Sequence, residues 1–199
     1  KVDFNMQLLF LENLLAEGKI DAIGEIGFDF YNEDFKATSD LQDFYFNCQI
    51  ELALKYNIPV IIHCRKANDR LFLYSKQLKK FPGVLFHSFM GSLVEAQSLC
   101  NKGINCYFSF GKQILNNNKN VINVVKNISL EHLLLETDAP YQFLKGEETT
   151  FLYDIKKIYY AAFCLRNNKN INFFEFEQNN DFFNFSCILK NNFLNLLNK

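Results

Sequence analysis

The sequence carries little excess charge of either sign, and this argues against a protein that captures nucleic acid by electrostatics alone. Its 199 residues have a formal net charge of −1. No basic tail or stripe stands out, even after Pro140. A non-catalytic DNA-binding module is therefore disfavoured. An enzyme that holds phosphate through metal ions stays possible, because it needs no basic surface.

Long hydrophobic runs, internal repeats and paired cysteine motifs are also absent from the sequence. No run approaches the roughly 18 apolar residues of a membrane span, so we expect no membrane contact. The six cysteines form no C-x-x-C pair, and several fall on apolar faces, as reduced buried thiols do. A cytoplasmic location is favoured, and nuclear or secreted locations stay open.

The sequence does contain short apolar runs that alternate with segments of helical spacing. Five runs are predicted as strands, namely DAIGEIG (21–27), PVIIH (59–63), GVLFH (83–87), INCYFSF (104–110) and LLLETD (133–138). Repeated strand-then-helix units imply a parallel sheet. We expect a single α/β domain over residues 1–199, a (β/α) TIM-type barrel with its helices outside.

This barrel is expected to be incomplete at its N-terminus. A closed eight-stranded barrel takes roughly 250 residues, and the chain already begins with a predicted helix. That helix runs from Lys1 to Glu17 and has Met6, Leu9, Phe10 and then Leu14 on one apolar stripe. Residues 142–199 have only helical patterns and Asn-rich tracts, so we expect a divergent helical C-terminal part of the same domain.

Three more helices are predicted from apolar spacing. The first follows a loop over 28–38 and starts at a capping box of Ser39 and Gln42, with its core stripe at Leu41, Phe44, Cys48, Leu52 and Tyr56. The second runs from about Asp69 to Lys80. The third starts at a capping box of Ser92 and Glu95.

Four residues able to bind a metal ion close separate predicted strands: Glu25, His63, His87 and Asp138. The carboxyl ends of parallel strands meet at one edge of a sheet, so these side chains are expected to converge. Alternation along a strand places Glu25 on the same face as Ile23. Each histidine taken alone is more often a hydrogen-bonded structural residue. Four ligands at equivalent positions favour a site for a hard or borderline divalent ion.

The segments around these residues resemble the TatD-type metal-dependent deoxyribonucleases of the amidohydrolase-like barrel superfamily. GEIGFDF (24–30) resembles that family's G-E-I-G-L-D-Y element, and VIIHCR (60–65) its P-V-I-I-H-S-R strand. FHSFMGS (86–92) resembles H-x-F-x-G-S, and LLLETDAPY (133–141) resembles L-L-E-T-D-A-P-Y. The order and spacing agree over residues 21–141.

The resemblance implies hydrolysis of DNA phosphodiester bonds of the 3′ to 5′ exodeoxyribonuclease type. Glu25 would bind or bridge the metal centre, His63 and His87 would be imidazole ligands, and Asp138 would bind metal and hold or deprotonate the attacking water. Glu25 and Asp138 are thus the predicted catalytic residues. Mg²⁺ is the favoured ion, with Mn²⁺ or Zn²⁺ as alternatives, and two ions are expected in the full-length enzyme. DNA is the expected partner. We expect a monomer, with no protein partner indicated.

Four further residues have predicted roles near this site. Arg65 is placed to bind a phosphate through its planar guanidinium group. A structural ion pair would explain the presence of this arginine equally well. Lys112 is a candidate contact for the DNA backbone, with an exposed loop lysine as the alternative. Asp29 and Glu136 are candidates to orient metal ligands by hydrogen bonding to them, without binding the metal ion themselves.

Two departures from the family pattern keep alternative functions open. The family's His-x-His pair is missing, since the chain has only three histidines. We expect that the units carrying it precede Lys1, and that this chain alone is poorly active. After Tyr141 the family's Arg- and Asn-containing segment is also replaced. The alternatives are a metal-dependent hydrolase of an amide or ester, such as an aminoacyl-RNA, and a non-catalytic relic of the barrel.

Overall fold

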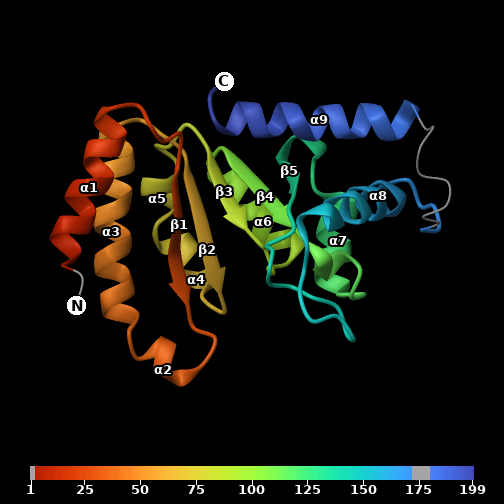
Figure 1. The fold of residues 1–199 in the computed structure, drawn as a ribbon, viewed down its shortest axis with the longest axis horizontal. Helices are drawn as coiled ribbons and strands as arrows, with labels where there is room; N and C mark the ends of the chain where they lie inside the picture. Colours follow the sequence, from red (N-terminus) through yellow and green to blue (C-terminus); the bar gives the residue numbers. More distant parts are fainter. Residues whose placement is uncertain (1–2, 172–179) are drawn as a thin grey trace.

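The centre of the molecule is a parallel β-sheet. A computed structural model describes residues 3–171 and 180–199 (Figure 1). The five strands follow one another across the sheet in sequence order: β1 (Ile23–Asp29), β2 (Val60–Arg65), β3 (Val84–His87), β4 (Cys106–Phe110) and β5 (Leu133–Leu135). All neighbouring pairs are parallel. The predicted five parallel strands are confirmed, and their carboxyl ends lie at one edge.

Helices surround this sheet (Figure 1). They are α1 (Phe4–Ala16), α2 (Glu33–Lys36), α3 (Ser39–Lys55), α4 (Asn68–Leu73), α5 (Ser75–Leu78), α6 (Leu93–Asn101), α7 (Lys119–Asn127), α8 (Ile155–Arg166) and α9 (Asn180–Leu196), with 3₁₀ turns η1 (Lys112–Ile114), η2 (Leu130–His132) and η3 (Leu152–Asp154). Helix α9 crosses the end of the sheet where the strands begin. There the Asn192 amide donates to the carbonyl oxygens of Leu130 and Leu133, at 2.7 and 2.9 Å.

Alternation along the strands separates a large core from a small one. The large core fills the space between the sheet and the outer helices. The small one lies on the inner face and contains Ile61, Leu85, Tyr107, Leu134 and Leu196. Because side chains two residues apart share a face, the inner face continues from Ile61 to His63, from Leu85 to His87 and from Leu134 to Glu136. The fold thus directs these polar groups to the carboxyl edge.

Strand β1 departs from simple alternation. Ile23 pairs with Val60, whereas Ile26 pairs with Ile62, so β1 contains one extra residue between them. Ile23 packs in the large outer core, while Glu25 lies on the inner side. The prediction that these two residues share a face is therefore wrong. The extra residue interrupts the alternation of side chains along β1. Ile23 can therefore face the outer core while Glu25, two residues later, faces the inner side.

The start of α3 also differs from its prediction. Thr38 is the N-cap and makes no side-chain cap. Gln42 reaches back to β1 instead: its amide accepts from the Asp29 N–H at 2.8 Å and donates to the Asp29 carbonyl at 3.1 Å. The short helix α2 occupies part of the predicted loop 28–38. Ser92 and Glu95, in contrast, form the predicted capping box at α6.

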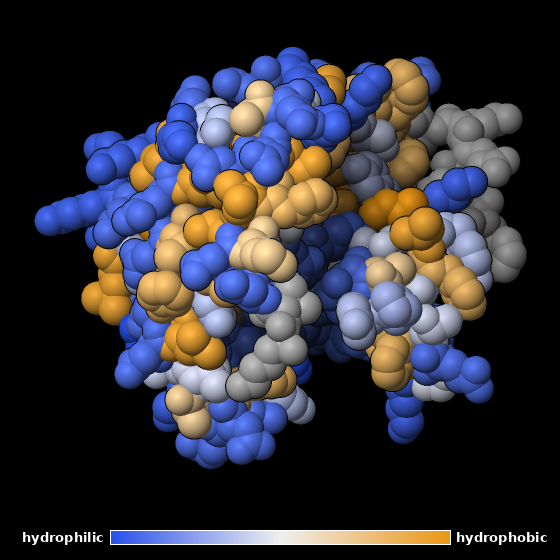
Figure 2. All heavy atoms as spheres, turned by 60° about the vertical axis from the view of Figure 1, so that its left-hand side comes forward, coloured by the Kyte–Doolittle hydropathy of each residue, from blue (hydrophilic) through white to orange (hydrophobic). Residues whose placement is uncertain are grey.

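The predicted apolar stripes of two helices are only partly buried, since Leu52 of the α3 stripe is buried as predicted but other members of the stripes are not. Leu41 and Phe44 of α3 are about half exposed, and its buried residues are Phe46, Ile50, Leu52 and Ala53. Apolar residues occur all round this helix, so its period does not define one face. In α1, Met6, Leu9 and Phe10 are exposed. The helix itself lies on the side of the molecule that Figure 2 brings forward. Its first two predicted residues, 1 and 2, lie outside the described residues.

One predicted helix is divided, and no membrane span is found. Residues 69–80 form α4 and α5, separated at Tyr74, whose ring packs against Phe28 and Phe46 with centroids 5.7 and 4.8 Å apart.

None of the helices in the described ranges has the length and hydrophobicity needed to cross a membrane. All six cysteines are free thiols.

Candidate metal and catalytic site

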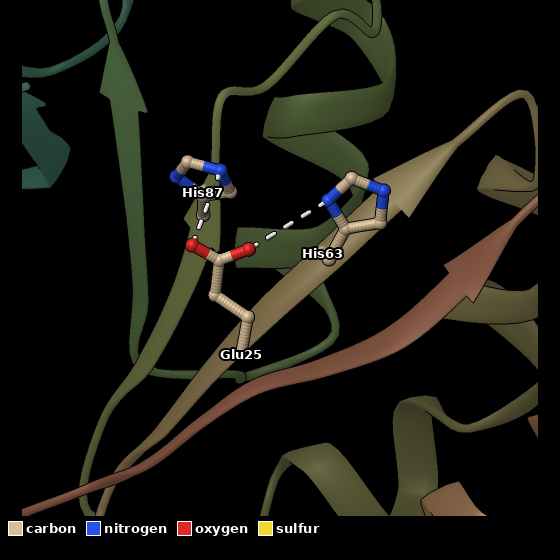
Figure 3. Close-up of side chains that lie close together, drawn as sticks. All are labelled: Glu25, His63 and His87. Atoms are coloured by element: carbon tan, nitrogen blue, oxygen red, sulfur yellow. Dashed lines mark ion pairs between the residues drawn. The ribbon is translucent and has the colours of Figure 1, made fainter. Parts of the chain in front are cut away.

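Three of the predicted ligands converge at the carboxyl edge of β1, β2 and β3 (Figure 3). The Glu25 carboxylate points between the two imidazoles. One of its oxygens lies 3.9 Å from His63 Nδ1, and the other lies 3.6 Å from His87 Nε2. One ligand atom from each of the three residues can be chosen so that all lie within 4.8 Å of one another. Among the residues that the structure describes, this is the one group of that kind.

Each imidazole is held on its far side by a carboxylate. His87 Nδ1 lies 2.9 Å from Glu136 Oε2, which also accepts from the Ser109 hydroxyl at 2.5 Å. His63 Nε2 lies 3.3 Å from Asp29 Oδ2. Asp29 and Glu136 thus each contact one of the predicted ligands, and their orienting role stays a prediction. Such contacts fix the ring and leave the opposite nitrogen to face Glu25.

Histidine 87 is the buried member of the group, with 9% of its side chain exposed. Burial by itself lowers the pKa of His87, but the hydrogen bond to Glu136 and the negative charges of Glu136, Glu25 and Asp138 raise it. The carboxylates prevail, so the pKa of His87 lies above its usual value. The site is therefore strongly negative and attracts a cation.

Asp138 adjoins the group through His87. Its Oδ1 is 3.8 Å from His87 Nε2. Its Oδ2 accepts a hydrogen bond from the Gln142 side-chain amide at 2.8 Å. Asp138 has a left-handed backbone (φ 53°), an uncommon conformation for a residue other than glycine. The structure thus gathers three of the four predicted ligands closely and sets the fourth beside them.

A pocket of about 530 Å³ opens over these residues. It is lined by Glu25, His63, Cys64, Arg65, His87, Ser88, Met90, Gln113, Asp138, Tyr141 and Gln142. Figure 2 shows that the surface on this side of the molecule is hollowed and that hydrophilic residues lie in its depth. The pocket could admit a charged substrate to the carboxylates and imidazoles.

Sequence reasoning missed the amides that line this pocket. Gln142 and Gln113 both donate to the Ser88 hydroxyl at 2.8 Å, and Gln113 also accepts from the Gly111 N–H. Gln142 thereby joins Asp138 to a chain of hydrogen bonds at the pocket wall. The only sequence signal for it is its place four residues after Asp138, at the point where the family pattern is lost.

Lys112 is not available to touch a nucleic acid backbone, and that prediction is wrong. Its side chain is 1% exposed, and its ammonium lies 2.6 Å from Glu147 and 2.8 Å from Asp154. Burial lowers the pKa of Lys112, but these two carboxylates raise it above the usual value overall. Because a buried ammonium needs partners, Lys112 ties the segment around residues 147–154 to η1.

Arg65 lies on the rim of the pocket, and no described residue forms with it the structural ion pair that was considered. Its guanidinium carbon lies 3.7 Å from the centre of the Tyr31 ring. Among the ion pairs between described residues, none includes Arg65. Its predicted contact with phosphate stays a prediction.

Comparison with known proteins identifies the family. The sequence pattern of the family described as TatD related DNase matches residues 3–178. The chain belongs to this family. The resemblance seen in the motifs around Glu25, His63, His87 and Asp138 is thereby confirmed.

TatD relatives with similar sequences are about twice as long as the matched part. The uncharacterized metal-dependent hydrolase YabD of Bacillus subtilis is 38% identical over 136 residues, covering 67% of this chain and 52% of YabD. The 3′-5′ ssDNA/RNA exonuclease TatD of Klebsiella pneumoniae is 37% identical, covering 64% and 48%. The deoxyribonuclease Tat-D of Schizosaccharomyces pombe is 38% identical, covering 63% and 40%. The chain therefore spans about half the length of the curated relatives it matches.

Solved TatD structures have the same fold. The TatD homologue YJJV from Escherichia coli superposes with a TM-score of 0.81 at 27% identity, over 99% of this chain and 72% of YJJV. A TatD-family hydrolase from Entamoeba histolytica gives 0.74 at 22% identity, over 98% and 69%. The predicted TIM-type architecture is confirmed, with the barrel left open in this chain between β1 and β5.

Proposed function

We propose that this TatD-family chain binds a divalent metal ion through Glu25, His63 and His87 and hydrolyses phosphodiester bonds of nucleic acid, with DNA as the substrate. The observation that carries the proposal is the convergence of one carboxylate and two imidazoles on one point, with the opposite nitrogen of each imidazole held by a carboxylate. A structural pair of histidines would not need a shared, half-exposed Glu25 between them.

The donor set fits a divalent ion. Three ligand atoms within 4.8 Å of one another can move onto one ion with small side-chain adjustments. A bound ion of this kind makes water a better nucleophile and offsets phosphate charge. Mg²⁺ is the ion that the family resemblance implies, while two imidazoles among three ligands suit Mn²⁺ or Zn²⁺ at least as well. A second ion, expected in a full-length enzyme, would need further donors.

The carboxylates of this chain have different tasks in the proposed reaction. Glu25 directs one oxygen to each imidazole, so it can bind the ion with both. Asp138 is fixed through Oδ2 by Gln142, which leaves Oδ1 beside His87 and open to the pocket. Asp138 is thus placed to take a proton from an attacking water. Arg65 on the rim would meet the negative charge of the substrate.

The printed functions of the relatives support this proposal. The Klebsiella protein is named as an exonuclease that acts 3′ to 5′ on single-stranded DNA and RNA, and the fission yeast protein as a deoxyribonuclease. We therefore propose a 3′ to 5′ exonuclease type of cleavage for the whole protein. Action as a cytoplasmic monomer stays a prediction.

An assay of labelled single-stranded DNA tests the proposal. The full-length protein is incubated with 5′-labelled oligonucleotide and Mg²⁺, Mn²⁺ or Zn²⁺, beside Asp138→Asn and the surface control Glu51→Gln. Stepwise shortening that needs metal, is lost in Asp138→Asn and is retained in Glu51→Gln is the expected result. Cleavage only of an ester or amide substrate, such as an aminoacyl-RNA, would favour that alternative instead. No metal binding and no cleavage of any substrate would favour a relic.

A further inference from the structure

Two cations lie together on one aromatic ring at the ends of β1 and β2. The Arg65 guanidinium carbon is 3.7 Å from the Tyr31 ring centre, and the Lys66 ammonium is 4.8 Å from it. The Lys66 ammonium also donates to the Tyr31 carbonyl at 2.9 Å. Tyr31 is itself 47% exposed. The group therefore combines two positive charges with a ring that fixes their positions.

The backbone beneath this group is well anchored. The Tyr31 N–H donates to Asp29 Oδ1 at 2.8 Å, and the Phe30 N–H donates to the Arg65 carbonyl at 2.8 Å. Lys66 has a left-handed backbone (φ 55°), which turns its side chain back over Tyr31. The cations thus extend from two strand ends that are hydrogen-bonded to each other.

Neither cation forms an ion pair with a carboxylate of the described residues. Other basic side chains pair with acids, such as Arg70 with Asp43 at 2.6 Å and Lys112 with Glu147 at 2.6 Å. Within the described ranges no ion pair involves Arg65 or Lys66. An exposed, unneutralised pair of cations beside a strongly negative metal site favours an anion that bridges the two.

The distance along β2 indicates which anion this is. Arg65 follows His63 by two residues on the same face, about 6.6 Å along a strand, and both line the pocket. Arg65 is thus set about this far beyond His63 at the carboxyl end of β2, with its guanidinium held against the Tyr31 ring. This separation is comparable to that of successive phosphates in a nucleic acid strand.

We propose that Arg65, Tyr31 and Lys66, together the Tyr31 site, bind the phosphate next to the one that is hydrolysed. The inference rests on the proposed nuclease function and adds the residues that hold the strand in register. Arg65 presents its N–H edge to the phosphate, Lys66 adds the second charge, and Tyr31 positions both cations through its ring.

Binding without catalysis tests the Tyr31 site. A short fluorescein-labelled oligothymidylate is titrated with the chain in EDTA, and its fluorescence anisotropy is followed at several KCl concentrations. We expect Lys66→Gln to weaken binding about fivefold at low salt. The plot of log affinity against log salt should become less steep by about 0.7, the value for one phosphate contact on a single strand. Tyr31→Ala should weaken binding similarly, while Tyr31→Phe should not.

The matched control is Lys80→Gln, which removes one exposed positive charge at the opposite edge of the sheet, just before β3. Unfolding midpoints of all variants show that the fold is intact. If Lys66→Gln and Tyr31→Ala bind like Lys80→Gln, or if the wild-type chain does not bind the oligonucleotide, the Tyr31 site is wrong. Metal-dependent cleavage is measured separately. Lys66-dependent binding without cleavage by the full-length protein would reject the nuclease and keep the Tyr31 site only as a site for a nucleic acid phosphate. Cleavage together with unaltered binding by Lys66→Gln would keep the nuclease and reject the Tyr31 site.

Discussion

The side-chain amide of Gln142 donates to Asp138 Oδ2 over 2.8 Å and to the Ser88 hydroxyl over 2.8 Å. Gln142 therefore fixes the carboxylate that we propose as the proton acceptor, although it lies where the family pattern ends. The Gln142 side-chain oxygen lies so close to Gly111 that a Cβ there would collide with it, so glycine is required beside this amide.

Replacing Gln142 by Leu should lower activity more than stability. Without the amide, Asp138 is free to turn away from His87, and loss of such a supporting hydrogen bond typically costs about 10- to 100-fold in activity or metal affinity. The measurements are kcat on labelled DNA and Mn²⁺ affinity by calorimetry. Gln97→Leu, an exposed change on α6, is the control and should alter neither. Unchanged kcat in Gln142→Leu would show that Asp138 does not need this support.

Replacing Glu136 by Gln should lower the pKa of His87. Burial opposes the charged imidazole, and the bond to Glu136 is the main influence that raises the pKa. With the carboxylate removed, the burial remains and the pKa falls. NMR titration of the three histidines in the metal-free protein measures this shift. His132, on the opposite edge, serves as an internal reference, and an equal shift there would mean a general rearrangement.

How far the sequence predicts this structure depends on whether the interacting residues are near or distant along the chain. Short apolar runs and their order predicted all five strands, because a buried parallel strand leaves a local signal. The positions of His63 and His87 on the inner face followed from simple alternation. The extra residue in β1 did not, since an inserted residue between Ile23 and Ile26 has no signature in the apolar pattern.

Side-chain contacts that depend on distant residues or on an uncommon backbone conformation explain what else the sequence did not predict. Lys112 looks like an exposed loop residue, and its partners Glu147 and Asp154 are distant in sequence, so no local pattern reports its burial. The Asp138 to Gln142 contact depends on the left-handed backbone at both residues (φ 53° and 58°). Non-glycine residues adopt that conformation infrequently, so it is not expected from residue type.

Replacing Lys112 by Met should destabilise the fold strongly. Asp154 is 4% exposed, and removing its buried partner leaves an uncompensated carboxylate, which costs about 3–5 kcal/mol. Lys157 contacts the same carboxylate at 3.3 Å but is 52% exposed. Lys157→Met is therefore the control, with an expected cost below about 1 kcal/mol. Urea unfolding of both variants gives the comparison, and equal costs would contradict the assigned role of Lys112.

Acid should remove the contribution of Glu147 to stability. The bond to Lys112 holds the pKa of Glu147 below its usual value. A carboxylate with a lower pKa in the folded state binds fewer protons there, so its contribution is complete above the unfolded pKa, about 4.3, and is lost as pH falls through the folded pKa. We expect Glu147→Gln to be less stable than the wild type at neutral pH and equal to it in strong acid. Glu148→Gln changes the exposed neighbouring residue and should match the wild type throughout. Thermal unfolding between neutral pH and pH about 2 measures these differences, and a gap between wild type and Glu147→Gln that persists in acid would exclude the ion pair as its cause.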